Sequence, residues 1–379
     1  MPLTSRQQGP IAVYGATGYT GRLVTAELAA AGADLVISGR DRRKLDALAA
    51  ETDGEVTVKV ATLDDAASLR ALLADCSVVA DCAGPFVRYG EPVLATAVET
   101  RTHYLDSTGE QPYMKLAFER YGPGASEAEI AVIPAMGFDY VPGDMIASLT
   151  AKGLGELDEL VLSYSWRGFT PSQGTARTTI EIISGGGVEW RDGTWVQRGG
   201  QGSAGEYVFP APVGRQRMMR YPAGEQITVP RHIPTRNVRT TMNASAFAGE
   251  RLAPVMAVMA GPLGLAMRTP LKRLAAAAIS RLPEGPSPAE RDSMRWMIAC
   301  DAKRGEVERR GVITGKDVYG LTAAAIRQGA MIAAGRGFDA RGALAPSQAF
   351  DPEQFLEGLN GFDVSWTVDG VETPVPVEA

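Results

Sequence analysis

The sequence has little cysteine and histidine: three cysteines and two histidines in 379 residues. Cys76, Cys82 and Cys300 are odd in number and lack the C-x-x-C spacing of structural zinc sites. A disulfide framework and a structural metal site are therefore not expected, and a reducing compartment such as the cytoplasm fits best.

Excess positive charge is also absent. Lys and Arg number 38 against 44 Asp and Glu, a net charge of −6. A general nucleic-acid binder needs a basic surface to meet phosphates, so nucleic acid is not an expected partner. The composition, 45% apolar and 22% charged, is typical of a globular protein and argues against wholesale disorder.

Long apolar runs are missing as well. The longest uncharged run, residues 252–267, contains Pro254 and Pro262 and is shorter than the roughly 20 residues of a membrane-spanning helix. The first ten residues lack the apolar stretch of a secretion signal. We predict a soluble, cytoplasmic protein without a transmembrane segment. At roughly 100–200 residues per domain, its length indicates two or three domains.

What the sequence does contain is a glycine-rich turn near its start. An apolar run at residues 11–14 enters GATGYTG, in which Gly15, Gly18 and Gly21 recur every third residue. A helical pattern follows until Gly32, and residues 35–38 form a second apolar run. This order is typical of a βαβ unit. The glycines permit a tight turn, backbone approach to a pyrophosphate and close packing of the helix, which predicts a dinucleotide site.

The end of the second strand indicates which dinucleotide binds. An NAD site usually has Asp or Glu there, but this strand ends in Ser38, Gly39 and Arg40. Arg40 is suited to stack on adenine and to pair with a 2′-phosphate, with Ser38, Arg43 or Lys44 assisting. NADP is therefore favoured. We interpret Arg42 as part of a solvated first helical turn.

Further strand and helix patterns continue the unit. Residues 56–61 predict a third strand that exits at Asp64, where an adenine edge usually lies, and residues 66–73 a helix. A fourth strand, 77–82, ends in Cys82, Ala83, Gly84, Pro85 and Phe86, and this loop is expected at the nicotinamide end. Residues 91–99 predict a helix and 103–105 a fifth strand. Cys82 is interpreted as a wall residue, because no base is identifiable near it.

The short-chain reductases and epimerases share this kind of glycine turn, but they protonate with a Tyr-x-x-x-Lys pair. No tyrosine of this sequence has a lysine four residues later. That class is therefore only a minor alternative.

Five blocks together resemble the saccharopine dehydrogenase-like oxidoreductases in order and spacing, most closely the bacterial branch of trans-acting enoyl reductases. They are GATGYTG (15–21), SGR (38–40), CAGPF (82–86), YLDSTGE (104–110) and GFDYVPGD (137–144). The strong resemblance covers residues 10–150, and weaker echoes follow at 174–179, 319–325 and 342–349.

The resemblance implies an α/β fold of three parts. These are an NADP-binding Rossmann domain with a doubly wound parallel sheet (1–130), an inserted α+β domain with a mixed sheet for substrate and dimerisation (131–320), and a C-terminal segment whose helices return to the first domain (321–379). It also implies NAD(P)-dependent reduction of a C=C or C=N bond.

The resemblance also assigns the cofactor residues. Those at the pyrophosphate would be Gly15, Thr17, Gly18, Tyr19 and Thr20, with Gly21 in the same turn. Arg40 would hold the adenosine phosphate, and Ala83, Gly84, Pro85 and Phe86 would border the nicotinamide riboside. Gly109, in the fourth block, completes the expected cofactor site.

The second half predicts alternating short strands at 160–166, 194–197, 205–209, 226–229 and 239–246, with a helix at 175–184. Such a mixed sheet is suited to cover a substrate or to form a homodimer surface. The Met- and Ala-rich residues 252–282 have two interpretations. They are core helices broken at Pro262 and Pro270, which we favour, or a lid over an acyl chain or a membrane or carrier contact.

Hydride transfer usually needs a proton donor as well. Tyr140 is the first candidate, and Asp106 and Tyr104 also lie in blocks expected to line the cleft. Water is an alternative proton source. His103 is expected as a core residue of its strand, and His232, between two prolines, as loop surface.

Three functions stay open. The leading hypothesis is an NADPH-dependent reductase of a polyketide-like enoyl thioester or an imine in bacterial secondary metabolism, acting on a small molecule that is free or carrier-protein-bound. The second is saccharopine- or opine-type C–N chemistry, with Arg177, Arg215, Arg231 and His232 as the obvious ligands for carboxylates. The third is a non-catalytic NADP sensor or scaffold.

Overall fold

The computed structural model describes residues 9–138, 140–185, 187–197, 203–246, 278–281, 283–369 and 371–372. The chain forms two compact units, each built from two stretches of sequence. The first comprises Met1–Val141 and Tyr319–Phe350, and the second Pro142–Val318 and Asp351–Ala379. The expected C-terminal segment is thus shared: residues up to Phe350 belong to the first unit and Asp351 onward to the second.

The first unit contains a parallel sheet in the order β15-β6-β5-β4-β1-β2-β3. This confirms the predicted Rossmann-type sheet, and its seventh described strand comes from the C-terminal stretch. The strands are β1 (Ile11–Tyr14), β2 (Leu35–Gly39), β3 (Val56–Val60), β4 (Val78–Asp81), β5 (His103–Asp106), β6 (Ala131–Ile133) and β15 (Gly342–Ala343).

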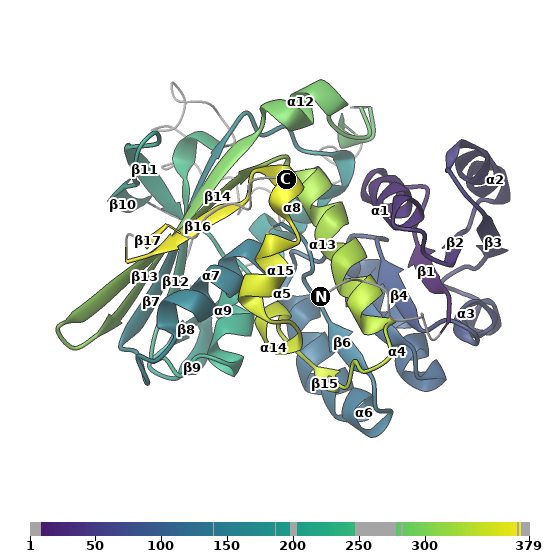
Figure 1. Cartoon of the computed structure of the whole chain (residues 1–379), viewed down its shortest axis with the longest axis horizontal. Helices are drawn as coiled ribbons and strands as arrows, with labels where there is room; N and C mark the ends of the chain where they lie inside the picture. Colours follow the sequence, from purple (N-terminus) through teal and green to yellow (C-terminus); the bar gives the residue numbers. More distant parts are fainter. Residues whose placement is uncertain are drawn as a thin grey trace. The chain divides into compact units, whose positions relative to one another are not determined.

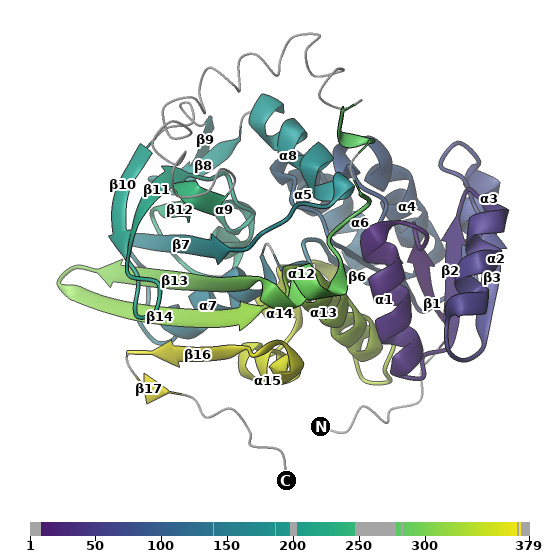
Figure 2. The same ribbon diagram turned by 90° about the horizontal axis from the view of Figure 1, so that it is seen from above.

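Helices cover both faces of this sheet, with α1 and α2 on one side and α3 and α4 on the other (Figures 1 and 2). Alternate strand residues such as Ala12, Tyr14, Val79 and Tyr104 point into the core on the α3–α4 side. The helical elements are α1 (Tyr19–Ala30), α2 (Arg42–Glu51), α3 (Ala66–Leu73), α4 (Phe86–Thr100), α5 (Gln111–Leu116), the π-helical η1 (Ala117–Tyr121), α6 (Gly122–Glu127), α13 (Val318–Ala333) and α14 (Pro346–Ala349).

Helix α13 joins this core from almost two hundred residues further along the chain. The Thr322 hydroxyl accepts a hydrogen bond from the Phe138 amide at 2.9 Å, and Arg327 pairs with Glu27 of α1 at 3.1 Å. Tyr319 packs edge-on against Tyr19, with ring centroids 5.3 Å apart. The C-terminal stretch is therefore an integral part of the nucleotide-binding unit.

The second unit is built on a mixed sheet in the order β10-β11-β12-β7-β13-β14-β16-β17, with β8 and β9 branching from β12. Its β7–β12 pair is parallel and its other described pairs are antiparallel. The strands are β7 (Glu159–Arg167), β8 (Val188–Arg191), β9 (Thr194–Gln197), β10 (Ser203–Val208), β11 (Arg215–Arg220), β12 (Val238–Asn243), β13 (Arg295–Arg304), β14 (Val307–Lys316), β16 (Ser365–Val368) and β17 (Val371–Glu372).

Helix α7 packs on this sheet at a point where β14 has no side chain. A Cβ on Gly311 would overlap the Thr150 hydroxyl and lie 3.0 Å from Ile146, both on α7. The helical elements of this unit are α7 (Val141–Ala151), α8 (Gln173–Gly185), α9 (Glu225–Thr228), η2 (Val229–Arg231), η3 (Ala244–Ala246), α12 (Pro288–Ser293), α15 (Pro352–Glu357) and η4 (Asn360–Phe362).

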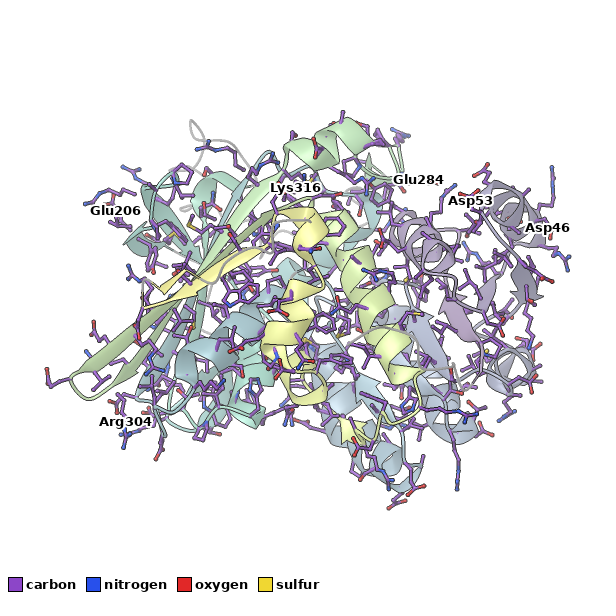
Figure 3. The ribbon with its side chains drawn as sticks, in the orientation of Figure 1. Asp46, Asp53, Glu206, Glu284, Arg304 and Lys316 are labelled. Carbon is purple, nitrogen blue, oxygen red and sulfur yellow. The ribbon has the colours of Figure 1, made fainter. Side chains whose placement is uncertain are left out.

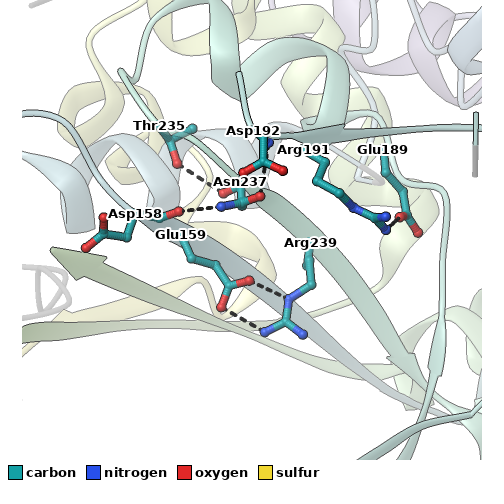
Figure 4. Close-up of polar contacts among 8 residues, drawn as sticks. All are labelled: Asp158, Glu159, Glu189, Arg191, Asp192, Thr235, Asn237 and Arg239. Atoms are coloured by element: carbon teal, nitrogen blue, oxygen red, sulfur yellow. Dashed lines mark hydrogen bonds and ion pairs between the residues drawn. The ribbon is translucent and has the colours of Figure 1, made fainter. Parts of the chain in front are cut away.

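Polar side chains fix the start of the β7–β12 pair (Figure 4). Asn237 donates to the Asp158 carbonyl and accepts from the Asp192 amide, at 2.8 and 3.2 Å. Two residues after Asn237, Arg239 pairs with Glu159 at 2.7 Å.

One predicted strand is wrong: residues 226–229 are helical, not extended. Glu225, Gln226, Ile227 and Thr228 form α9 and are all buried. Four residues are too few to carry a periodicity that separates helix from strand, and full burial leaves α9 without a solvent-facing polar side. Two interpretations were given for residues 252–282, as core helices or as a lid or contact surface. Of these residues, 252–277 and 282 lie outside the described residues.

Candidate cofactor and hydride-transfer site

The glycine turn at the end of β1 is shaped by close backbone approach. Gly15 has φ +74°, and a Cβ there would lie 3.0 Å from the Ala83 amide nitrogen. A Cβ on Gly21 would overlap the Gly15 carbonyl and lie 2.8 Å from the Ala16 Cα. Any side chain at these positions would push the turn away from the β4 loop or from α1.

The N-terminus of α1 is open to an anion. Gly18 is the N-cap and has no side chain, so it gives the first turn of α1, which begins at Tyr19, no side-chain cap. Uncapped amides and the positive end of the helix dipole favour a phosphate. Thr17 lies in the turn that precedes them. These residues fit the pyrophosphate of a dinucleotide.

The end of β2 offers an unpaired hydroxyl and an exposed cation. Ser38 is fully buried, and its Oγ has no hydrogen-bond partner among the described residues. Gly39 ends the strand, and Arg40 is exposed just beyond it. Asp41 caps α2 by accepting from the Lys44 amide at 3.2 Å. The side chains of Ser38, Arg40 and Lys44 fit an adenosine phosphate.

Arg42 has a structural partner instead. Its guanidinium pairs with Asp46 at 2.8 Å on the exposed face of α2, one turn along the helix. This agrees with its interpretation as a residue of a solvated helical turn.

Tyr14 and Asp64 lie at the neighbouring strand ends. Burial, with the nearby charge of Asp81, raises the pKa of Tyr14 to about 12, while the charge of Arg40 opposes this shift. Asp64 is exposed, and a hydrogen bond from Thr62 lowers the pKa of its carboxyl. The Arg40 charge therefore acts across this edge of the sheet.

A buried carboxylate holds the loop after β4. Asp81 Oδ1 accepts from the Ala83 amide at 2.9 Å, and burial raises the pKa of Asp81 to about 8. Cys82 donates its amide to the Tyr14 carbonyl, and burial raises the pKa of its thiol. A thiol held protonated by burial is a poor nucleophile, which agrees with a wall role for Cys82.

Asp106 likewise holds the loop that follows β5. Its Oδ1 accepts from the amides of Thr108 and Ala135, at 2.8 and 3.0 Å. Burial raises the pKa of Asp106 to about 7, although these amides and the Tyr104 hydroxyl favour the ionised form. Asp106 and Asp81 are register partners on adjacent strands, so the two carboxyl groups stand side by side.

Glu110 connects the two loops. Its Oε1 accepts from the Phe86 amide and its Oε2 from the Val87 amide, both at 2.9 Å. These are the first amides of α4, whose N-cap Pro85 has no side-chain cap. The Phe86 ring packs on Tyr113, with centroids 5.6 Å apart. Glu110 thus fixes the Gly84–Phe86 segment expected at the nicotinamide.

The two tyrosines proposed from sequence as catalytic residues are fully buried and hydrogen-bonded. Tyr140 donates to the Gly109 carbonyl at 2.8 Å. Tyr104 donates to Asp81 and lies 2.7 Å from the Tyr113 hydroxyl, and burial raises the pKa values of both Tyr104 and Tyr113. Each hydroxyl must give up such a contact before it can protonate a substrate.

The four residues considered as carboxylate ligands lie in the second unit with different partners. Arg215 pairs with Glu206, Arg177 bonds Gln173, and Arg231 lies over the Trp195 ring. His232 lies in a turn after η2, as predicted, but the prediction that it is at the surface is wrong. Its side chain is 10% exposed, and its Nε2 lies 2.9 Å from the fully buried Asp144. Flanking prolines indicate a turn but carry no information on burial.

Sequence reasoning missed Asp81, Tyr113 and the role of Glu110. Asp81 carried a usable signal, because it is the one acidic residue in the buried run of β4. Charged residues are almost never fully buried without a partner, so an acid at the end of such a strand points to a structured loop. Glu110 carried none, because the amides it accepts from lie more than twenty residues away, and Tyr113 carried none, because its contacts with Tyr104 and Phe86 join different elements.

His103 lies in β5, as predicted, and its Nδ1 accepts from the Ala131 amide at 3.0 Å. Burial lowers the pKa of His103, so the neutral ring joins β5 to β6. The described residues hold no group of three or more His, Cys, Asp or Glu arranged for a metal ion. In the same part of the chain, no helix is long and apolar enough to cross a membrane.

Comparison with known proteins identifies the nucleotide-binding unit. Residues 11–133 match the saccharopine dehydrogenase NADP binding domain. The glycine turn and the strand order described above thus belong to an NADP-binding Rossmann unit. Residues 11–133 thus carry a domain of the saccharopine dehydrogenase family, in agreement with the resemblance of the motifs in this part of the chain.

Several relatives are similar over about half of the chain. "Putative trans-acting enoyl reductase Rv2449c" of Mycobacterium tuberculosis is 33% identical over 186 residues, 46% of this chain and 44% of that protein. The human "Saccharopine dehydrogenase-like oxidoreductase" is 28% identical over 51% of this chain and 46% of its own length. A Caenorhabditis elegans "Lipid droplet localized protein" is 29% identical over 47% and 46%. These matches span less than half of each relative.

The fold similarity extends further than the sequence similarity. Yeast saccharopine dehydrogenase (L-Glu forming) in its apo form superposes with a TM-score of 0.57, covering 97% of this chain and all of that one. At 14% identity this establishes the shared fold. The α/β architecture with a second, mixed-sheet unit is therefore that of saccharopine dehydrogenase.

Proposed function

We propose that this chain is an NADPH-dependent reductase that transfers hydride to the C=C bond of an enoyl thioester or to a C=N bond. The family of its NADP-binding domain supports an oxidoreductase. The enoyl reductase named among its relatives supports C=C reduction.

The observation that carries this proposal is the arrangement at the end of β2. Ser38 has a buried hydroxyl without a partner, and Arg40 is exposed beside it. The nearest acid in the sequence, Asp41, caps α2 by accepting from the Lys44 amide through its Oδ1. A hydroxyl and a guanidinium in this place suit a 2′-phosphate, which only NADP carries.

When bound, NADPH supplies the hydride, and the residues of this chain place and enclose it. The turn from Gly15 to Gly21 would hold the pyrophosphate. Asp81, through Ala83, and Glu110, through Phe86 and Val87, would keep the loop after β4 rigid beside the nicotinamide. Fixing this loop before the substrate arrives reduces the reorganisation needed for reaction.

The proton comes from solvent water in this scheme. Tyr104, Asp106 and Tyr140 are fully buried and bonded within the first unit, so we assign them positioning roles. Tyr140 holds Gly109, and Asp106 holds the backbone at Thr108 and Ala135.

The cofactor part is tested by titrating the full chain with NADPH and NADH, for wild type, Arg40→Ala and Arg42→Ala. We expect Arg40→Ala to weaken NADPH binding by about 10-fold or more, because a charged hydrogen-bond partner is lost. Arg42→Ala removes the same charge two residues away but breaks only the exposed pair with Asp46, so its affinity should stay near wild type. Equal affinity for NADH and NADPH, or an unaffected Arg40→Ala, would contradict the assignment.

Substrate class is decided by following NADPH oxidation with enoyl thioesters and with imines formed from amines and oxo acids. Enoyl turnover supports the leading proposal. Turnover confined to amino-acid-derived imines would favour saccharopine- or opine-type C–N chemistry, and NADPH binding without any turnover would favour a sensor or scaffold. A cytoplasmic location and a homodimer remain part of the proposal, and light scattering of the purified chain tests the dimer.

A further inference from the structure

A cavity of about 740 Å³ lies wholly within the second unit. It opens where β7 ends, β13 begins and β14 ends, and its lining includes Trp166, Phe169, Trp296 and Met297. Small-molecule sites typically measure roughly 300–1,000 Å³ and are largely apolar. The cavity therefore has the size and lining for the body of a small organic molecule.

Two arginines stand next to each other in this lining. Arg167 and Arg295 are direct register partners on the antiparallel strands β7 and β13, so their side chains lie on the same face. Like charges in directly opposed positions destabilise a sheet. Arg295 donates to the carbonyls of Asp292 and Met294, and the Arg167 guanidinium has no hydrogen bond or ion pair with any described residue.

The acidic groups nearby are already engaged by another cation. Lys316, the register partner of Arg295 on β14, lies 3.2 Å from Asp363 and 3.6 Å from Asp292. Figure 3 shows Lys316 at the end of the hairpin opposite to Arg304. Asp363 is the one carboxylate among the described lining residues. With three cations and two carboxylates, this rim keeps an excess positive charge at the two arginines.

We propose that this cavity binds an anionic amphiphile, with an acyl or aryl body inside and a carboxylate or phosphate between Arg167 and Arg295. Guanidinium groups suit either anion, because both present oxygens that accept two parallel hydrogen bonds. This deepens the proposed function by naming the part of the substrate that the second unit recognises. The cavity proposal rests on the proposed function in one respect: that function identifies the bound amphiphile as the substrate.

The test uses the full chain saturated with NADP⁺ and four ligands with the same eight-carbon chain length: octanol, octylamine, octanoate and S-octanoyl-phosphopantetheine. Binding is followed by tryptophan fluorescence, because all five tryptophans belong to the second unit. We expect at least one anionic ligand to bind about 10-fold or more tightly than octanol, and octylamine to bind most weakly. Preference for octanoate identifies a carboxylate, and preference for the phosphopantetheine thioester identifies a phosphate.

Variants locate the binding. Arg167→Gln and Arg295→Gln should each reduce the affinity for the preferred anion by about 10-fold and leave octanol binding unchanged. Arg239→Gln is the matched control, since Arg239 is an exposed arginine on the same sheet that already pairs with Glu159 (Figure 4). Ala246→Trp, which places a ring in the cavity lining, should abolish binding of all the ligands.

Equal binding of octanol and both anions, or an Arg167→Gln chain that binds the anion like wild type, would overturn the proposal. Titration of the same variants with NADPH separates the two hypotheses. If the chain binds NADPH normally but binds no amphiphile, only the proposal for this cavity is rejected. Amphiphile binding without NADPH binding rejects the cofactor assignment alone.

Discussion

Two carboxyl groups, Asp81 and Asp106, stand side by side in the first unit at the ends of β4 and β5, without access to solvent. Each accepts backbone amides that shape a loop, and neither has a cationic partner among its described contacts. Burial raises their pKa values to about 8 and about 7. The loops expected around the nicotinamide are therefore held by groups that change charge near neutral pH.

Burial of these two carboxyl groups makes the free energy of unfolding of the first unit depend on pH. The unfolded-state pKa of Asp is about 3.9, so between about pH 4 and pH 7 the folded chain keeps a proton on Asp106 that the unfolded chain has lost. The contribution of Asp106 to the free energy of unfolding should therefore fall as pH rises through this window and level off above it, while that of Asp81 continues to fall up to about pH 8. Asp106→Asn keeps an oxygen for the amides of Thr108 and Ala135 but does not titrate, so it should flatten this fall.

Thermal unfolding at about pH 5 and about pH 8, followed by circular dichroism, checks this prediction. Tryptophan fluorescence identifies the transition of the second unit and allows it to be set apart. The stability of Asp106→Asn relative to wild type should rise with pH by up to a few kcal/mol. A constant difference between the two chains at all pH values would reject the role of Asp106 as a titrating group.

Helix α4 shows how an element can depend on a distant side chain. The sequence pattern predicts a helix over 91–99, whereas α4 begins at Phe86. Its first turn has no local cap, and the amides of Phe86 and Val87 are satisfied by Glu110, more than twenty residues later. The early start of α4 therefore follows from a long-range hydrogen bond.

Replacement of this carboxylate should loosen the first turn of α4. Glu110→Gln puts an NH₂ group against an amide donor, which should cost about 1–3 kcal/mol of stability in the first unit and weaken NADPH binding. Glu99→Gln is the matched control at the other end of α4, because its exposed pair with Arg70 contributes little. Hydrogen exchange of residues 86–90 measures the effect. Unchanged exchange in Glu110→Gln would show that the helix start does not depend on Glu110.

Local sequence patterns predicted elements in both units where capping residues and short-range periodicity define them. The predicted helix 66–73 has the bounds of α3, where Asp65 supplies a side-chain cap, and the predicted strand 194–197 those of β9. The residues proposed to hold the phosphates were inferred from the glycine spacing and from Arg40. The helix at 225–228 and the buried His232–Asp144 pair did not follow, because full burial and partners nearly ninety residues apart leave no local trace.

At the scale of the whole chain, the nucleotide-binding unit is completed by residues that follow the second unit. Strand β15 consists of Gly342 and Ala343 alone, which pair with Ala131 and Val132 of β6. So short a strand has no periodicity to recognise, and its pairing joins residues about two hundred positions apart. The sequence echoes at 319–325 and 342–349 mark this return, but its position in the sheet came only from the structure.

A substitution in Tyr319–Phe350, the C-terminal stretch of the first unit, should therefore damage the proposed cofactor site. Gly329 lies on α13, and a Cβ there would be 2.8 Å from Met136 and 2.9 Å from Leu105. Met136 donates its amide to the Asp106 carbonyl, and Leu105 precedes Asp106 in β5. Gly329→Leu overpacks this contact, at a cost of about 1–3 kcal/mol. Displacement of either neighbour moves the end of β5, where the Asp106 loop begins.

We expect Gly329→Leu to lower both the unfolding temperature of the first unit and its NADPH affinity, while the tryptophan-detected transition of the second unit keeps its midpoint. Gly361→Leu is the control, because no heavy atom lies within 4 Å of a Cβ built at Gly361, in η4 of the second unit. Calorimetry with and without NADPH, together with tryptophan fluorescence, separates the two transitions. A loss confined to the tryptophan signal would mean that α13 supports the second unit instead. Wild-type NADPH affinity in a destabilised Gly329→Leu chain would show that the C-terminal return stabilises the Rossmann unit without positioning its site.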